Sequence, residues 1–392
     1  MRKIIVSLTS YPARIKTVYQ VIESIQKQTI QADKILLWLS INEFPNKIDD
    51  LPNNLLRFNS SMQVEIRWVE DNLKSHKKYY YALQEFSEDI VITIDDDVYY
   101  ESTMLETLLK SYEAHPTAIS ARNVHRVYAY KDAIAPYCSW NHMIDEYEDV
   151  ERMDLCAIGV GGVLYPPGCS NQKWFDKEKI AKFAQNQDDI WLKFQEILLN
   201  IPVVYVKSKQ EDYIIKGSQT VALMYSNIET DNDICIDEML KLFINEQSVK
   251  QWIFELQQIE EVLLNKKQVC IRELISYCGQ RVSIFGAGIN AKSLFLFINK
   301  FIPEINVEYF LVSNTEDNFS HICDIPVIRY DSLSEDEAHI VLLGVSNPVI
   351  KEIESIMEML QNYIWVRVDL LTVKQVYRGL SCLEKKKESW YQ

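Results

Sequence analysis

The sequence has 392 residues, more than a single hydrophobic core usually serves, so we expect two domains. It carries 41 Lys and Arg against 56 Asp and Glu, a formal net charge of −15, which disfavours a protein that binds nucleic acid or an anionic membrane surface. The eight cysteines contain no CxxC pair and so indicate neither a zinc site nor a dense disulfide framework.

The first residues lead directly into an apolar run that is too short for the core of a signal peptide. No apolar run approaches the roughly 18 residues of a membrane span. We therefore expect a cytoplasmic protein and leave open a peripheral position at the inner face of the membrane.

In the N-terminal half, apolar runs predict buried strands over residues 3–8, 34–39, 64–69 and 90–94, with helices over 18–25 and 74–86 between them. Strands that alternate with helices favour an α/β fold with a mostly parallel sheet. Ligands of such sheets bind beyond the carboxyl ends of the strands. We therefore expect one crevice to be surrounded by the turns at residues 9–14, 40–43, 70–71 and 95–97.

Three consecutive carboxylates, Asp95, Asp96 and Asp97, follow the fourth predicted strand. Like charges repel one another, and their desolvation is costly without a cation or another partner. Aspartate oxygens suit hard ions such as Mg²⁺ and Mn²⁺, which often bridge carboxylates to phosphates. The alternative is a solvated acidic turn.

The helix before these carboxylates carries the one dense basic cluster near them, formed by Lys74, His76, Lys77 and Lys78. Such cations could hold a diphosphate that a metal also binds, although a solvated helix face is the simpler reading. Farther along, another helix is predicted over residues 103–113. A stretch rich in aromatic rings follows, and it suits either contact with a sugar or packing in the core. Its members are Tyr128, Tyr130, Tyr137, Trp140 and His142.

Residues 159–168 hold four of the ten glycines, which indicates a close approach of the backbone or positive φ angles. Downstream, Asp188 and Asp189 begin a predicted helix. Acidic residues are favoured in a first helical turn by capping and the helix dipole. The functional alternative is a general base for a hydroxyl nucleophile.

The C-terminal part opens a second α/β unit with a strand over residues 281–285, a GxGxxA turn and an apolar helix. The glycines fit a phosphate-binding turn at a helix N-terminus. However, the next strand ends at Ser313 and Asn314, where an acid would hold an adenosine ribose, although Asp317 lies nearby. Both a degenerate and a working dinucleotide site fit this pattern.

We therefore predict a first domain over residues 1–237, an Asn/Asp-rich turn over 227–233 near its end, and a helical connector over 238–278. A smaller Rossmann-like domain over 279–378 and a solvated, Lys-rich tail over 379–392 would follow.

The first domain resembles GT-A glycosyltransferases, in particular the bacterial family-2-like enzymes of surface-polysaccharide synthesis. The resemblance rests on five motifs in order: SLTSYPAR over residues 7–14, the helix with Lys78, the acidic triplet as a DxD motif, GVGGVLYPPG over 159–168, and DDIWL over 188–192. The C-terminal unit resembles the Rossmann-like domains found beside sugar-modifying and capsule-synthesis enzymes. The resemblance implies a GT-A mixed-sheet domain followed by a smaller Rossmann-like α/β domain.

The resemblance also implies roles for individual residues. A nucleotide-binding turn would contain Thr9, Tyr11 and Arg14, and Lys78 would sit near the donor phosphates. The acidic triplet would bind the donor and its metal through Asp95, Asp96 and Asp97, with Asp97 the direct ligand and Asp95 the second. The donor and acceptor sugars would border the turn that includes Gly161 and Gly162. The catalytic carboxylate would be Asp189, with Asp188 beside it. One departure is Lys74-Ser75, where relatives have a Gly-Pro pair.

The implied function is a metal-dependent glycosyltransferase of the hexosyltransferase class, with Mn²⁺ or Mg²⁺ and a nucleoside-diphosphate sugar, a UDP-sugar first among donors. It would serve bacterial surface-glycan synthesis with a glycan, lipid-linked or glycoprotein acceptor, and would invert the anomeric centre if Asp189 is the base. Nucleic acid is not an expected partner, and homo-oligomers are left open. The alternatives are a nicotinamide-dependent sugar-modifying enzyme that uses Gly286 and Gly288, and an inactive GT-A scaffold.

Overall fold

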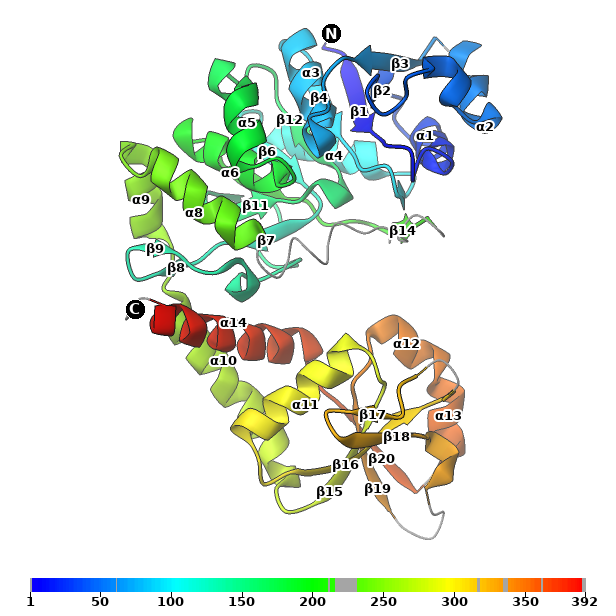
Figure 1. Ribbon diagram of the computed structural model, residues 1–392, viewed down its shortest axis with the longest axis vertical. Coiled ribbons are helices and arrows are strands. Elements are labelled where there is room, and N and C mark those ends of the chain that lie inside the picture. The colour runs from blue at the N-terminus through cyan, green and yellow to red at the C-terminus, as the bar shows by residue number, and fades with distance from the viewer. Residues whose placement is uncertain are drawn as a thin grey trace. The chain divides into compact units, whose positions relative to one another are not determined.

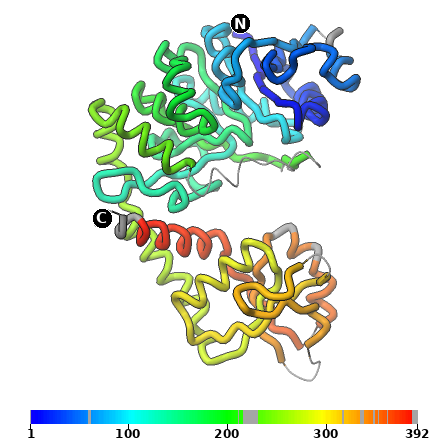
Figure 2. Tube along the Cα trace, viewed as in Figure 1, coloured from blue at the N-terminus to red at the C-terminus, as the bar shows by residue number. Residues whose placement is uncertain are grey.

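A computed structural model describes residues 2–60, 62–210, 212–215, 231–315, 318–333, 338–360 and 362–389 (Figure 1). Contacts divide the chain into two compact units, residues 1–257 and 258–392, coloured blue to green and yellow-green to red in Figure 2. Among the helices of the described ranges, none is both long and apolar enough to cross a membrane.

Unit 1 is built on an eight-stranded mixed sheet in the order β10-β13-β6-β12-β4-β1-β2-β3. The four strands predicted in the N-terminal half are present, and they pair in parallel as β1 (Ile4–Thr9), β2 (Lys34–Ser40), β3 (Val64–Val69) and β4 (Ile90–Thr93). The sheet then becomes mixed, because β12 (Val163–Tyr165) runs antiparallel to both β4 and β6 (Ile119–Ala121). Its far edge is formed by β13 (Val203–Tyr205) and β10 (Glu151–Arg152).

Helices cover both faces of this sheet because its strands are apolar on both faces. Ile5 and Leu36 belong to a core cluster that includes residues of α3 (Lys77–Glu85) and α6 (Asp188–Leu198). The alternating neighbours Val6 and Leu37 belong to a second cluster with α1 (Val18–Gln26) and α4 (Met104–Ala114). The predicted α/β class with a large mixed sheet is therefore confirmed.

In the part of unit 1 that the structure describes, three ribbons of two strands each lie outside the main sheet: β5 (Val98–Tyr99) with β14 (Tyr213–Ile214), β7 (Val124–Arg126) with β11 (Leu155–Ala157), and β8 (Ala129–Tyr130) with β9 (Ala133–Ile134). Within the described residues, the remaining helical elements of the unit are η1 (Lys47–Asp50), α2 (Asn53–Leu56), η2 (Arg57–Ser60), η3 (Lys74–His76), η4 (Tyr137–Ser139), η5 (Gly159–Gly161), η6 (Gln172–Phe175), α5 (Lys177–Phe183), α8 (Asn232–Phe243) and α9 (Gln247–Glu255). Most of the Asn/Asp-rich turn predicted before α8, residues 227–230, lies outside the described residues.

Unit 2 holds a six-stranded sheet in the order β17-β18-β16-β15-β19-β20. Its strands are β15 (Arg281–Phe285), β16 (Asn306–Val312), β17 (His321–Ile322), β18 (Ile325–Arg329), β19 (His339–Leu343) and β20 (Tyr363–Arg367). All of them pair in parallel except β17. Counting only the parallel strands, the order is 3-2-1-4-5, as in a Rossmann-like fold.

The helical elements among the described residues of unit 2 are α10 (Ile259–Leu274), η9 (Ile275–Tyr277), α11 (Ile289–Phe301), η10 (Tyr330–Ser332), α12 (Asn347–Glu352), α13 (Glu354–Met359) and α14 (Leu370–Ser389). Both α10 and α11 pack against α14. Residues 379–389, expected to form a tail, continue α14 as helix. The predicted domain boundaries at 237 and 278 remain predictions.

The GxGxxA turn follows β15 as expected. Gly286 has φ +113°, and a Cβ there would lie 2.7 Å from Val345 Cγ1. Ser313, where an acid could have held a ribose, is exposed, and Asp317 lies outside the described residues. Glycine at position 286 is therefore explained by structure alone: its backbone has a positive φ angle, and the side chain of Val345 in the neighbouring loop leaves no room for a Cβ.

Gly344 offers a test of the packing in unit 2. A Cβ at Gly344 would lie 2.7 Å from Ile284 Cγ2 and 2.8 Å from Ala291 Cα, which is too close for any side chain. We predict that Gly344→Ala lowers the opening free energy of β15 and β19, measured by amide hydrogen exchange, by about 1–3 kcal/mol. Gly288→Ala is the control, since nothing lies within 4 Å of its added Cβ, and it should cost under about 1 kcal/mol. Equal losses in the two variants would contradict the prediction.

Candidate active site

The acidic triplet lies on the loop between β4 and β5, and each of its carboxylates faces a cation. Lys78 Nζ is 2.8 Å from Asp95 Oδ1. Arg14 Nη1 is 2.8 Å from Asp96 Oδ1 and 3.0 Å from Asp97 Oδ2. Asp96 and Asp97 are only 6% and 7% exposed. Asp96 and Asp97 are thus desolvated and ion-paired, whereas Asp95 is ion-paired with 29% of its side chain exposed.

Asp96 is the most firmly held member of the triplet. Ser10 Oγ donates a hydrogen bond of 2.6 Å to its Oδ2. Burial raises the pKa of Asp96, and the charge of Arg14 opposes that rise. Asp96 therefore fixes the turn after β1 to the acidic loop, with Tyr11 placed against Arg14 at 5.7 Å from ring centroid to guanidinium.

Lys78 connects the acidic loop to the start of α6. Its ammonium lies 2.8 Å from Asp95 and 3.0 Å from Asp188 Oδ2. Burial alone would lower the pKa of Lys78, but the carboxylates of Asp188 and Asp95 raise it well above its ordinary value. Lys78 therefore remains charged at any physiological pH.

The two carboxylates that begin α6 have different surroundings. Asp188 accepts a 2.8 Å hydrogen bond from Ser75 Oγ on one oxygen and faces Lys78 with the other. Burial alone would raise the pKa of Asp188, but Lys78 outweighs it, so that pKa is lowered. Asp189 accepts a 3.2 Å bond from the Gly159 amide, and burial together with the charge of Asp188 raises its pKa well above the ordinary value. Of the two neighbouring carboxylates, Asp189 therefore has the higher proton affinity.

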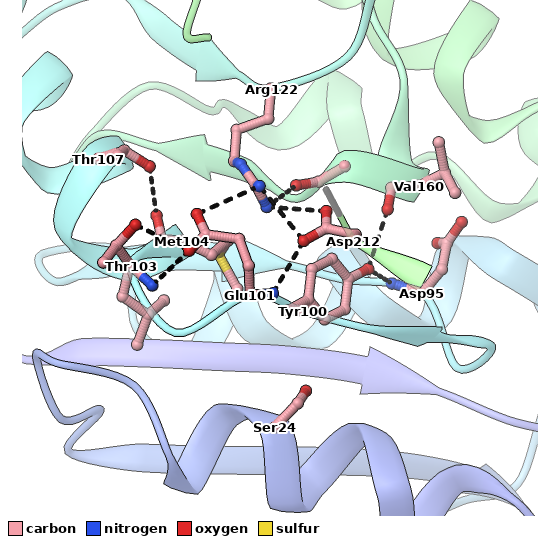
Figure 3. Close-up of polar contacts among 12 residues, drawn as sticks. Ser24, Asp95, Tyr100, Glu101, Thr103, Met104, Thr107, Arg122, Val160 and Asp212 are labelled. Carbon is pink, nitrogen blue, oxygen red and sulfur yellow. Dashed lines mark hydrogen bonds and ion pairs between the residues drawn. The ribbon is translucent and has the colours of Figure 1, made fainter. Parts of the chain in front are cut away.

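The glycine-rich turn closes over Lys78. A Cβ at Gly159 would lie 2.6 Å from Lys78 Nζ and 3.3 Å from Asp95 Oδ1, so only glycine permits this approach. Tyr100 connects the same turn to the acidic loop, because its hydroxyl accepts from the Asp95 amide at 2.9 Å and donates to the Val160 carbonyl at 3.1 Å (Figure 3). Gly162 ends the turn with φ +90°.

An open pocket of about 540 Å³ adjoins the carboxyl ends of β2 and β3 and is lined by Asn42, Val69, Glu70, Asp71, Tyr81 and Lys177. The carboxylate of Asp71 accepts from the Tyr81 hydroxyl and from Lys177. Burial alone would raise the pKa of Asp71, but these bonds outweigh it and lower that pKa. Tyr81 also stacks on Trp38, whose carbonyl accepts from Thr9 Oγ1 at 2.8 Å. The pocket therefore presents an ionised carboxylate close to the turn after β1.

The structure joins most of the predicted site residues through short contacts. Arg14, Lys78, the acidic triplet, the glycine turn and the acidic start of α6 form one connected network. The basic cluster divides, because Lys77 is buried against Glu43 at 3.0 Å and His76 bonds the Ala184 carbonyl at 2.7 Å. The ring-rich stretch contributes mainly to the core, where four of its members are buried: Tyr128, Tyr130, Tyr137 and Trp140.

Several residues of the network were not predicted from the sequence. Ser75 was noted only as a departure from relatives, and Tyr100 was assigned no role. Arg122 and Asp212 were assigned no role, although a buried arginine requires acidic partners. That requirement could have drawn attention to Arg122 only if its burial had been predictable.

Within the described parts of the chain, no group of three or more His, Cys, Asp or Glu side chains is arranged to hold a metal ion. Asp95 and Asp97 supply carboxylate oxygens from one loop, which fit a hard cation that takes its remaining ligands from phosphate and water. The chemistry of these donors therefore fits Mg²⁺ or Mn²⁺, and Asp97 and Asp95 are the residues that would hold such an ion.

Comparison with known proteins finds no matching family model and no matching curated protein. Solved structures with some likeness include S. aureus TarS 1-349 in complex with UDP, with 13% identity over 70% of this chain and 86% of that chain and a TM-score of 0.37. Others are HddC from Yersinia pseudotuberculosis, with 13% identity over 58% and 100% and a TM-score of 0.32, and UTP-bound UGPase from Acinetobacter baumannii, with 13% identity over 63% and 99% and a TM-score of 0.32. Likeness at this level carries no argument about the site or the activity.

The opposite pKa shifts of Asp188 and Asp189 predict opposite effects of neutralisation. Above the ordinary aspartate pKa of 3.8, folding takes up a proton at Asp189, so its contribution to stability falls as pH rises toward the folded-state pKa. Asp189→Asn should therefore raise the midpoint of thermal unfolding at pH 7, and this gain should shrink toward pH 4.

Asp188→Asn is the matched variant. Its ionised carboxylate contributes stability above pH 3.8 that is lost as pH falls through the folded-state pKa. Asp188→Asn should therefore cost about 1–3 kcal/mol at pH 7, because the buried ammonium of Lys78 loses an ionised partner. Scanning calorimetry of both variants between pH 4 and 8 measures the two effects on stability. A loss of stability of the same size in both variants would refute the opposite pKa shifts of Asp188 and Asp189.

Proposed function

We propose that the protein is a metal-dependent glycosyltransferase that moves a sugar from a nucleoside-diphosphate sugar to an acceptor hydroxyl. The observation that carries this proposal is the position of Lys78, a buried ammonium between Asp95 of the acidic loop and Asp188 at the start of α6. A fixed cation beside carboxylates that suit a metal is the arrangement that a departing diphosphate requires.

In the proposed reaction, Asp189 accepts the proton of the acceptor hydroxyl as the hydroxyl oxygen attacks the anomeric carbon. The bond between that carbon and the β-phosphate oxygen breaks, and its electron pair stays on the diphosphate. Lys78 stabilises this developing charge, and a divalent cation held by Asp97 and Asp95 would stabilise it further. Direct attack of this kind inverts the anomeric centre. The glycine turn would border the two sugars at Gly161 and Gly162.

We further propose that the pocket beside β2 and β3 receives the nucleobase end of the donor. Asp71 is an ionised acceptor, so it selects a base edge with an N–H donor, and uracil of a UDP-sugar has one. Thr9, Tyr11 and Arg14 would flank the ribose and diphosphate between this pocket and Lys78. The role in bacterial surface-glycan synthesis, with a glycan, lipid-linked or glycoprotein acceptor, rests on the sequence resemblance.

The metal role of the acidic loop is tested with Asp97→Ala. We predict that Mn²⁺ with a nucleotide sugar raises the unfolding temperature of the wild type, because a ligand that binds only the folded state stabilises it. Asp97→Ala or a chelator should abolish this shift and lower donor hydrolysis about 100-fold or more.

Asp132→Ala is the control, because it removes the same charge from an exposed position. Donor binding that survives both Asp97→Ala and chelation would refute metal dependence. Binding of NAD(P) would instead favour the nicotinamide alternative, and nucleotide binding without any turnover would favour the scaffold. Pyrophosphate release from a nucleoside triphosphate would indicate a nucleotidyltransferase.

The pocket assignment makes a separate prediction about Asp71. Asp71→Asn should raise the dissociation constant of the preferred nucleoside diphosphate about tenfold, the effect of one lost charge-assisted hydrogen bond, in titration calorimetry across UDP, GDP, CDP and ADP. Asp132→Asn should leave it unchanged. An unaltered constant for every nucleotide would exclude the base from this pocket.

A further inference from the structure

Arg122, directly after β6, is the largest charged side chain buried next to the site, and its guanidinium is 0% exposed. One nitrogen, Nη1, donates to the Gly161 carbonyl at 3.2 Å and to Asp212 Oδ2 at 3.0 Å. The other, Nη2, lies 3.3 Å from Asp212 Oδ1 and 3.4 Å from Glu101 Oε1. Figure 3 shows these acceptors converging on one guanidinium.

The first acceptor belongs to the glycine turn. Gly161 lies in η5 with Gly159, whose amide donates to Asp189. A displacement of the Gly161 carbonyl would therefore move the backbone that orients the proposed base. A Cβ at Gly161 would lie 2.7 Å from the Asn123 side chain, so the turn is also packed against the residue that follows Arg122.

The second acceptor belongs to the segment that supports the acidic loop. Asp212 accepts from the Glu101 amide at 2.9 Å and directly precedes β14. The strand β14 pairs with β5, which follows Asp97, and the Ile215 amide donates to the Asp97 carbonyl at 2.8 Å. Arg122 thus bonds both the turn that holds Asp189 and the segment that holds Asp97.

A buried arginine between two carboxylates is not a strong source of stability, because apolar residues of similar volume often stabilise a core as well or better. Its rigid, planar fork instead fixes the directions of several acceptors at once. We propose that Arg122, with Asp212, is a positioning residue that sets the spacing between Asp189 and the Asp97 loop for sugar transfer. This role rests on the proposed glycosyltransferase activity.

The test compares Arg122→Lys and Asp212→Asn with Arg126→Lys. Arg126 lies on the neighbouring strand β7 and also forms an ion pair, with Asp154 at 2.9 Å, but none of its described contacts reaches the site. Steady-state rates are measured with a nucleotide sugar and Mn²⁺, and the dissociation constant of the nucleoside diphosphate is measured by calorimetry.

Both site variants should lower kcat about tenfold or more, because small misplacements of reacting groups are costly. They should leave the nucleotide dissociation constant and the donor KM within about threefold, and Arg126→Lys should keep the wild-type kcat. Folded site variants with wild-type kcat would overturn the positioning role while the glycosyltransferase proposal stands. A loss in nucleotide affinity as large as the loss in kcat would also overturn the positioning role, and the glycosyltransferase proposal would again stand. If neither site variant folds, Arg122 is a folding residue and the role is also overturned. Wild-type protein without turnover would overturn the function itself.

Discussion

The ammonium of Lys78 is the interaction on which the candidate site depends. It is buried, it is paired with Asp95 and Asp188, and the glycine turn passes so close that no side chain fits at Gly159. Removing two carboxylates and a lysine from water is costly, and their mutual attraction offsets that cost only when the geometry is good. The glycine turn, the Ser75 hydroxyl and the firm placement of α3 supply this geometry. The network holds its charged groups in fixed positions through these contacts, and fixed charges of this kind are the condition for effective electrostatic catalysis.

The same desolvation separates two neighbouring acids into different chemical roles. Asp188 is next to a fixed cation and stays ionised, whereas Asp189 is next to Asp188 and holds its proton more tightly. No such division exists in the sequence, where the two residues are adjacent and identical. It arises because successive residues of a helix point in different directions, one toward Lys78 and the other toward the Gly159 amide.

The strands and the acidic loop of unit 1 could be predicted because their signals are local. Four β-branched or leucine-rich runs gave β1 to β4, and the parallel order placed their carboxyl ends together. Arg122, Asp212 and Tyr100 could not be predicted, since their roles depend on contacts between segments up to 111 positions apart along the chain. The stretch rich in aromatic rings was ambiguous for a related reason. Tyr137 and Trp140 are buried in the core, but the same residues in the same sequence could equally form a surface that binds a sugar. The Rossmann-like order of unit 2 was signalled by its glycine turn, where Gly286 has a positive φ angle and a close neighbour in Val345.

The position of Arg14 affects how a metal ion could reach the acidic loop. One guanidinium lies against both Asp96 and Asp97, so the acidic loop carries an internal counterion. A divalent ion that approached Asp97 would therefore compete with a resident cation and would not meet a bare cluster of negative charge. Such an exchange would lower the affinity for any metal ion and raise the selectivity among ions. An ion of low charge density gains too little binding energy at Asp97 to displace the guanidinium. An ion that also brings a phosphate offers Arg14 a new anionic partner. The loop would then favour a metal that arrives together with its nucleotide over the metal alone.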